Sequence, residues 1–285
     1  MAYVNTKEML SRARYEGYAV GAFNIVDYTT MEAVVMAAHD MRAPVIIQTS
    51  QKTVEQMGFD ILPAMAKTLA ARTDVPVAMI LDHGTKTDVI EGCIASGWTS
   101  VMIDASAYPF DENVRLIKHV VELAHGKGIT VEGELGHIGG KEEHIDVETD
   151  QELLTEPEMV VKFHELTDVD SLAVGIGTKH GLYKSKDVKL DFDRLEKIME
   201  LTDFPIIIHG CSDLSDENIN RLVSYHPSKM NISTEIKYRY LDSYTKYIND
   251  HPDEYEPIKC VKYVRDAVYD LVKGIMIKFK SAGKA

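Results

Sequence analysis

Short apolar runs alternate with amphipathic stretches along most of this chain. The apolar runs are rich in β-branched residues and end in turn or capping residues, which is typical of buried strands. They are Ala19–Asn24, Pro44–Thr49, Pro76–Asp82, Ser100–Asp104, Ile129–Glu134, Ser171–Ile176, Pro205–His209 and Lys229–Ile232. The stretches with helical spacing between them are Tyr28–Asp40, Thr53–Arg72, Thr87–Ser96, Glu112–Lys127, Glu156–Leu166, Asp191–Leu201 and Asp216–Tyr225. Because neighbouring parallel strands need a crossover connection, this alternation predicts a parallel sheet.

The number of strand-helix units favours a closed barrel over an open sheet. The eight predicted strands match a barrel, whereas an open dinucleotide-binding sheet usually has fewer strands and a glycine-rich loop after the first. Here the first strand ends in Gly21-Ala-Phe-Asn24. We therefore predict an α/β fold, a (β/α)8 TIM barrel. No low-complexity linker divides the chain, so we expect residues 1–285 to form a single domain.

Two segments exceed what a minimal barrel requires. The segment Gly136–Glu156 is rich in Gly, Glu and His and follows the fifth predicted strand, so it is expected to form a long loop over the active face. The chain from Thr234 onward adds C-terminal helices that the barrel does not need. Such helices often provide subunit contacts, and we expect a homodimer or homotetramer.

Composition narrows the class of protein. The 31 Lys and Arg residues against 45 Asp and Glu residues give a net charge of −14, which argues against a nucleic-acid partner or an anionic membrane surface. A phosphorylated small molecule remains compatible, since a few backbone N–H groups bind it locally. The three cysteines are an odd number without CxxC spacing and indicate reduced thiols. No apolar segment approaches the roughly 20 residues of a membrane span, so a soluble, cytoplasmic protein is expected.

Three histidines, His83, His180 and His209, each stand at the carboxyl end of a predicted strand. Parallel α/β proteins place their chemistry at these ends, and three imidazoles with one open position form a typical catalytic zinc site. A single strand-end histidine is more often structural. The shared location of all three favours a metal site.

Carboxylates share the same location. Asp82 directly precedes His83, so the two side chains point to opposite faces unless the strand turns there. A carboxylate beside a metal ligand is well placed to move protons, although a solvated or capping role is the plain alternative. Asp104 and Glu134 end the fourth and fifth strands. Either could orient a histidine or bind the metal in an alternative position, or form a buried ion pair with a barrel lysine.

Small hydrogen-bonding residues follow the sixth, seventh and eighth strands, in Gly175–Gly181, His209–Ser212 and Asn231–Thr234. Loops after the last strands of barrel enzymes often bind phosphate through backbone amides and hydroxyls. Separately these sequences are ordinary turns and helix caps. As an ordered set they indicate an anion site.

The ordered set of motifs resembles the class II, zinc-dependent ketose-bisphosphate aldolases, and within them most of all the tagatose-bisphosphate and inositol-catabolic branch. The likeness extends from Gly21 to the end of the chain. The motifs that carry it are Leu81-Asp-His-Gly84, Ser100–Asp104, Glu134-Leu-Gly136, Gly139-Gly-Lys-Glu142, Gly177-Thr-Lys-His-Gly181, His209-Gly210 and Lys229–Glu235.

The resemblance implies a role for each matching residue. His83, His180 and His209 would bind Zn2+, Asp82 would exchange a proton with the C4 hydroxyl of the substrate, and Glu142 would move the C3 proton. Some members also bind a monovalent cation, Na+ or K+, near the phosphate. The residues implied in contact with the sugar phosphate are Asn24, Ser50, Gly181, Gly210, Cys211, Ser212, Asn231, Ile232, Ser233 and Thr234.

One departure from the family pattern keeps alternatives open. Relatives usually read His-Gly-Gly/Ala-Ser-Gly where this chain has His209-Gly-Cys-Ser-Asp213. An ionised Asp213 that pointed inward would repel a phosphate. The leading hypothesis is a lyase that splits a phosphorylated ketose into dihydroxyacetone phosphate and an aldehyde. The alternatives are an aldolase for an unphosphorylated or unusual ketose, a non-catalytic sugar-phosphate-binding homologue, and a metallohydrolase.

Overall fold

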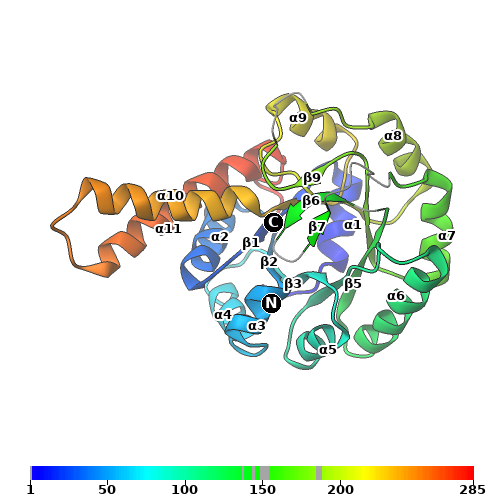
Figure 1. The fold of residues 1–285 in the computed structure, drawn as a ribbon, viewed down its shortest axis with the longest axis horizontal. Coiled ribbons are helices and arrows are strands. Elements are labelled where there is room, and N and C mark those ends of the chain that lie inside the picture. The colour runs from blue at the N-terminus through cyan, green and yellow to red at the C-terminus, as the bar shows by residue number, and fades with distance from the viewer. Residues whose placement is uncertain (1, 137, 143–144, 148–153, 184–187) are drawn as a thin grey trace.

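Eight parallel strands close into a barrel surrounded by helices in the computed structural model of the protein (Figure 1). The structure describes residues 2–136, 138–142, 145–147, 154–183 and 188–285, with the backbone alone at 139–142 and 145–147. Around the barrel the strands follow the order β1, β11, β10, β8, β5, β4, β3, β2. The predicted (β/α)8 TIM barrel is therefore confirmed.

The barrel strands coincide with the eight predicted apolar runs, because strands of a parallel barrel are buried on both faces and read as continuous apolar sequence. They are β1 (Val20–Asn24), β2 (Val45–Ser50), β3 (Val77–Gly84), β4 (Ser100–Ile103), β5 (Thr130–Leu135), β8 (Ser171–Val174), β10 (Ile206–Ile208) and β11 (Lys229–Ile232). The helices are α1 (Lys7–Glu16), α2 (Tyr28–Met41), α3 (Gln51–Met57), α4 (Ile61–Ala70), α5 (Thr87–Ala95), α6 (Phe110–His125), α7 (Pro157–Thr167), α8 (Phe192–Leu201), α9 (Asp216–Ser224), α10 (Thr234–Asp250) and α11 (Pro257–Lys278).

The helical pattern differs from the prediction at two places. The expected helix Thr53–Arg72 is two helices, α3 and α4, because Gly58 ends the first with φ of 93°, a conformation that favours glycine. The sequence pattern did not predict α1. Its Met9, Leu10 and Ala13 pack with small and branched residues of the barrel interior, so it closes the end of the barrel at which the strands begin.

Within the segment predicted as a long loop after β5, the described residues include two strands of a second sheet. Strands β6 (Gly139–Glu142) and β7 (Ile145–Val147) pair antiparallel, and β6 pairs in parallel with β9 (Lys179–His180). Figure 1 shows this small sheet over the middle of the barrel. The segment is therefore joined by backbone hydrogen bonds to the strand that carries His180.

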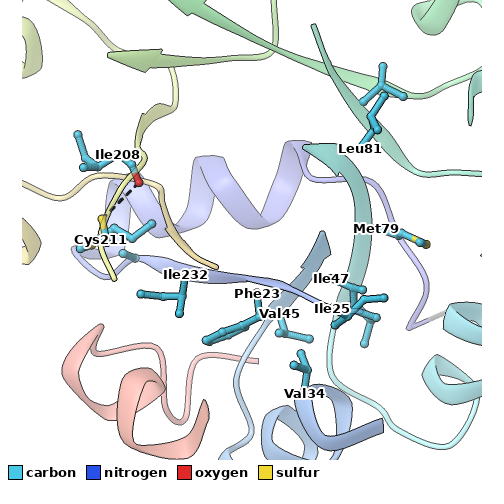
Figure 2. Packing of buried hydrophobic residues seen from close by; sticks show 14 of the residues in the cluster. Phe23, Ile25, Val34, Val45, Ile47, Met79, Leu81, Ile208, Cys211 and Ile232 are labelled. Atoms are coloured by element: carbon cyan, nitrogen blue, oxygen red, sulfur yellow. Dashed lines mark hydrogen bonds between the residues drawn. The ribbon is translucent and has the colours of Figure 1, made fainter. Parts of the chain in front are cut away.

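The main core lies between the strands and the surrounding helices. Figure 2 shows Phe23, Val34, Val45 and Ile47 in this layer beside β1 and β2, and Met79 beside β3. Side chains at Phe23, Val45 and Ile47 are fully buried. The barrel scaffold is therefore held by close apolar packing, which leaves the strand ends to carry polar residues.

Helices α10 and α11 form an antiparallel pair that projects away from the barrel (Figure 1). These are the extra C-terminal helices that the sequence predicts. Among the helices of the described residues, none combines the length and apolar character that crossing a membrane requires.

Candidate active site

The three predicted metal ligands meet at the end of the barrel where the strands finish. His83 lies near the end of β3, His180 ends β9, and His209 follows β10 directly. One ring nitrogen from each lies within 4.8 Å of the others, and all three residues are buried. Residues far apart in the sequence thus form one cluster that could hold a metal ion.

A turn in the backbone brings both Asp82 and His83 to the barrel mouth. His83 has φ of 46°, and the pairing of β3 with β4 shifts between Leu81 and Gly84. A Cβ atom at Gly84 would lie 2.6 Å from the carbonyl oxygen of Met102, so only glycine fits there. The left-handed residue explains why the two neighbouring side chains do not point to opposite faces as in an extended strand.

In two of these histidines, the ring nitrogen that points away from the cluster, here called the outer nitrogen, contacts a carboxylate. His83 Nδ1 lies 2.8 Å from Asp104 Oδ2, and His209 Nε2 lies 2.8 Å from Glu132 Oε1. Ser106 in turn donates to Asp104 Oδ1 from its hydroxyl at 2.7 Å and its N–H at 3.1 Å. Metal-binding histidines in other proteins are fixed in this way. The carboxylate accepts a hydrogen bond from one ring N–H, so the second ring nitrogen keeps its lone pair for the metal.

The other ring nitrogens of these two histidines, here called the inner nitrogens, face each other within the cluster. His83 Nε2 and His209 Nδ1 lie 2.9 Å apart. If both outer nitrogens carry the proton, these inner atoms are two lone pairs, which repel at this distance unless a cation or a proton lies beside them. The donor set therefore fits a divalent metal that prefers imidazole, as zinc does.

The electrostatics of the cluster come from buried charges. Burial lowers the pKa of His83, but the carboxylates of Asp82, Asp104 and Glu134 outweigh it and raise that pKa well above its ordinary value. Burial lowers the pKa of His209 to about 4. Burial also raises the pKa of Glu134, together with the charge of Asp104. Asp104 and Glu134 form a second possible ligand group with His83, as the sequence suggested.

Asp82 is held by two amides at the cluster's edge. Asn24 Nδ2 donates to Oδ2 at 2.8 Å, and Asn231 Nδ2 donates to Oδ1 at 3.3 Å. Gln48 Nε2 fixes Asn24 by donating to its Oδ1 at 2.5 Å. Asp82 as a whole is 3% exposed. Donors on both oxygens hold the carboxylate in one orientation.

A polar cavity opens beside Asp82. Its lining includes most of the residues predicted to contact the substrate, namely Asn24, Gly181, Gly210, Ser212, Asn231, Ser233 and Thr234, and the cavity is also lined by Gln48, Asp82 and His180. Ser233 Oγ and Asn231 Oδ1 are buried and have no hydrogen-bond partner among the described residues. Ser233 precedes α10 without capping it through its side chain. Buried polar atoms without partners and a helix N-terminus suit an anionic ligand.

Two neighbouring loops of this cavity are joined tightly. Gly210 has φ of 67°, and a Cβ atom there would lie 2.7 Å from the carbonyl oxygen of Lys179. The Tyr183 hydroxyl accepts from the Lys179 N–H at 2.8 Å and donates to the Gly210 carbonyl at 2.7 Å. The loops that carry His180 and His209 are therefore held at a defined distance.

Three residues predicted to contact the substrate are not among the described residues that line this cavity. Cys211 is buried, its thiol donates to the carbonyl of Ile208 at 3.4 Å (Figure 2), and burial raises its pKa. Ile232 is buried in the main core. Ser50 caps α3 by accepting from the Thr53 N–H. The alternation of side chains along a strand turns Ile232 away from its polar neighbours Asn231 and Ser233.

Asp213 is also absent from the described lining of the cavity. It is half-buried, has φ of 63°, and donates its N–H to Glu235 Oε1 at 2.8 Å. The neighbouring Ser212 does line the cavity, and its hydroxyl accepts from the Ser233 N–H at 3.2 Å.

The backbone of Glu142 lies in β6, two residues beyond Gly140, which is paired with His180. The side chain of Glu142 lies outside the part of the chain that the structure describes. Its predicted role therefore stays a prediction, to which the strand pairing adds that this segment is attached next to a metal-ligand candidate.

Sequence reasoning missed Glu132 and Lys229. Lys229 Nζ donates to both oxygens of Glu132, at 2.9 and 2.7 Å, and both side chains are buried. A signal was present, because each is a charged residue inside an otherwise apolar strand, and Glu132 shares a strand face with Glu134. The buried ion pair considered for Glu134 is formed by Glu132 instead.

Comparisons with known proteins agree with this geometry. A family model described as fructose-bisphosphate aldolase class-II matches residues 4–284. The YdjI aldolase from Escherichia coli K12 has a similar structure, with a TM-score of 0.87 and 30% identity over 99% of both chains. A putative fructose-1,6-biphosphate aldolase from Coccidioides immitis has a TM-score of 0.88 and 26% identity, covering 97% of this chain and 96% of that one.

A third solved structure shows the same fold at lower identity. Fructose-bisphosphate aldolase from Campylobacter jejuni has a TM-score of 0.86 and 22% identity, over 100% of this chain and 97% of that one. The family match spans nearly the whole sequence, from before the first barrel strand to the last residues after α11. The protein therefore belongs to the class II fructose-bisphosphate aldolase family.

Proposed function

We propose that this protein is a zinc-dependent aldolase, an aldehyde-lyase that reversibly cleaves a phosphorylated ketose into dihydroxyacetone phosphate and an aldehyde. Membership of the family supports aldolase activity. The observation that carries the proposal is the cluster of three histidines next to an oriented, buried carboxylate and a polar cavity. Fructose 1,6-bisphosphate, tagatose 1,6-bisphosphate and related sugar phosphates are the candidate substrates.

The metal centre is proposed to use His83, His180 and His209. Zinc bound by them would supply a Lewis acid that polarises the ketose carbonyl and stabilises the negative charge that develops as C3–C4 breaks. No lysine Schiff base is then required. Asp104 and Glu132 support this assignment, because each accepts a hydrogen bond from the outer nitrogen of a ligand histidine.

Two carboxylates would complete the reaction. Asp82 takes the proton of the C4 hydroxyl as C3–C4 breaks, which leaves the aldehyde. Glu142 delivers a proton to C3, which gives dihydroxyacetone phosphate. The C4 hydroxyl loses one proton and the C3 carbon gains one, so the cleavage is balanced. The amides of Asn24 and Asn231 keep the Asp82 carboxylate in one orientation for this transfer.

The polar cavity is the proposed phosphate site. Ser212, Ser233 and Thr234 would donate hydroxyl or backbone hydrogen bonds, and the first turn of α10 would add its N–H groups. Asp213 contacts Glu235 through its backbone N–H group. Asp213 is not among the described residues that line the cavity. This supports a phosphorylated donor over the unphosphorylated ketose that Asp213 first suggested.

A sugar-phosphate-binding homologue without catalysis is the second candidate. It needs the polar cavity but neither a metal nor an oriented proton acceptor. In a protein that only binds sugar phosphates, a buried carboxylate at Asp82 would cost folding free energy without a benefit, since its burial must be compensated by several hydrogen-bond donors. The presence of both groups in one site favours the enzyme.

A substrate panel tests the proposed function. With zinc present, retro-aldol cleavage of fructose 1,6-bisphosphate, tagatose 1,6-bisphosphate and 5-dehydro-2-deoxygluconate 6-phosphate is measured by coupled reduction of the released dihydroxyacetone phosphate. At least one is expected to turn over at about 1 s⁻¹ or faster. Each assay is run in Na+ and in K+, because a monovalent cation near the phosphate would change the rate.

The same panel decides between the alternatives. Proton exchange at C3 of dihydroxyacetone but not of its phosphate would instead support an unphosphorylated donor. Ligand binding without turnover of any ketose would support the non-catalytic homologue. The preferred substrate also tests the resemblance to the tagatose-bisphosphate and inositol-catabolic branch, which stays a prediction.

We also propose that the α10–α11 arm binds a second copy of this chain. Its apolar side chains are unusually exposed, with Leu241 62%, Ile248 60%, Ile258 66% and Tyr255 92% accessible. The arm projects from the barrel (Figure 1), and a groove at its tip is lined by apolar and aromatic residues including Tyr244 and Pro252. Closed homo-oligomers are the commonest assemblies, and an exposed apolar surface favours one.

Light scattering coupled to gel filtration tests the assembly. The wild type is expected to elute as a homodimer or homotetramer, and the double variant Leu241→Lys/Ile248→Lys as a smaller species. Tyr15→Lys is the control, because Tyr15 is 92% exposed but lies on α1, outside the α10–α11 arm. A wild-type protein that is monomeric at micromolar concentration would contradict this proposal.

A further inference from the structure

A lysine is completely buried beneath the candidate metal centre. Lys229 lies at the start of β11 and its side chain is 0% exposed. Its Nζ donates to Glu132 Oε1 at 2.9 Å and to Oε2 at 2.7 Å. Burying two charges costs several kcal/mol per ion before their attraction is counted. An apolar pair would be at least as stabilising, so the ion pair calls for a reason other than stability.

The contacts of Glu132 indicate that reason. Its Oε1 atom also accepts from His209 Nε2 at 2.8 Å. The other ring nitrogen of His209, Nδ1, lies 2.9 Å from His83 Nε2 at the centre of the histidine cluster. A continuous chain of contacts thus joins Lys229 to Glu132, Glu132 to His209, and His209 to the centre.

The three residues come from separate parts of the barrel. Glu132 is on β5, His209 follows β10 and Lys229 is on β11, while β8 lies between β5 and β10. Lys229 binds both oxygens of Glu132 at once, which fixes the plane of the carboxylate. Its Oε1 is then directed at the Nε2–H of His209, and the ring presents Nδ1 inward.

His83 has a different support. Its carboxylate, Asp104, is held by the hydroxyl and the N–H of Ser106 at the strand end, and no lysine among the described side chains is bonded to it. Glu132 instead contacts His209 from inside the barrel, where no turn of the local backbone could orient the Glu132 carboxylate. Lys229 orients it there. The two histidines are therefore positioned by independent means.

We propose that Lys229 and Glu132 are a positioning pair that holds His209 with Nδ1 aimed at the metal and so sets the affinity of the site for zinc. The inference rests on the proposed function in that zinc is the metal which that function requires. Neither residue is proposed to touch the substrate.

The test removes the pair without leaving a buried charge. Glu132→Leu/Lys229→Met eliminates both charges and the acceptor for His209. Glu132→Gln/Lys229→Met eliminates the charges but keeps an amide oxygen as acceptor. Zinc affinity of the metal-free protein is measured by competition with a chromogenic chelator. The first variant is expected to bind zinc about 10- to 100-fold more weakly, and the second to recover most of that loss.

Two further measurements separate positioning from folding. Thermal unfolding of each metal-free variant reports whether the barrel forms. Nitrogen NMR of the histidine rings in the wild type is expected to show His209 with its proton on Nε2, a result that depends on no variant. The control Glu196→Leu/Lys197→Met alters an exposed pair on α8 and is expected to leave zinc affinity unchanged.

The outcomes are distinct from those of the substrate panel. A folded Glu132→Leu/Lys229→Met variant that binds zinc within about twofold of the wild type overturns the inference, as does a wild-type His209 protonated on Nδ1 or a wild type without zinc affinity. If the wild type binds zinc and the variants lose affinity, but no ketose is cleaved, the proposed function fails while the positioning pair stands.

Discussion

Replacing Asp82 with asparagine is expected to lower kcat for ketose cleavage by about 10²- to 10⁴-fold, the usual contribution of a general base. Zinc content and thermal stability should change little. Asn231 Oδ1 has no partner among the described residues, so its amide can rotate and accept from the new Nδ2 group. The variant thus loses the proton acceptor while the hydrogen bonds around position 82 are kept. Steady-state kinetics with the best ketose of the panel gives the measurement.

Asp203→Asn provides the matched control for this variant. Asp203 is exposed and precedes β10, at the opposite end of the barrel from the histidines. Its substitution should leave kcat and KM unchanged. An Asp82→Asn enzyme with more than about a tenth of wild-type kcat would show that another group takes the C4 proton, because general-base catalysis alone predicts a larger loss.

Removing the metal is expected to have the second large effect. Dialysis against a strong chelator should lower turnover at least about a hundredfold, because the carbonyl is then no longer polarised, and stoichiometric zinc should restore it. His180→Ala should remain poorly active even with added zinc. Its ring is one of the three that meet at the centre, and a three-histidine site needs each ligand to leave a single open position. Zinc per protomer is determined by elemental analysis.

His119→Ala is the control for the ligand variant. His119 is exposed on α6, away from the cluster, and its loss should change neither zinc content nor rate. Full turnover in excess chelator, with zinc shown to be absent by elemental analysis, would disprove the metal mechanism, because the ketose would then be cleaved without a Lewis acid.

Much of the architecture could be predicted because it depends on local patterns. Apolar runs such as Pro205–His209 are buried on both faces of a parallel barrel, and they indicate strands wherever they occur. The placement of His83, His180 and His209 at strand ends followed from the same patterns. Helix α1 was missed because it precedes the first predicted strand and so lies outside the strand-helix alternation, and only its packing into the barrel end explains it.

Other features depend on contacts between distant segments. The left-handed backbone of His83 brings Asp82 to the mouth, but no pattern in the local sequence specifies it. Cys211 faces the core, although its position in the motif suggested a substrate contact. Tyr183 ties the loops after β9 and β10 together through two backbone groups, and this requires both loops to be in place.

By itself the sequence determined the α/β barrel, the end at which its chemistry lies, and the residue types gathered there. Hydrophobic periodicity and chain order suffice for these, since parallel strands carry their carboxyl ends to one side. Only the tertiary structure decided which carboxylate supports which histidine. The pairing of Lys229 with Glu132, and of Glu132 with His209, joins β11, β5 and the end of β10 across the barrel interior. Such partners are set by how the closed strands are staggered, which no single segment of the chain encodes.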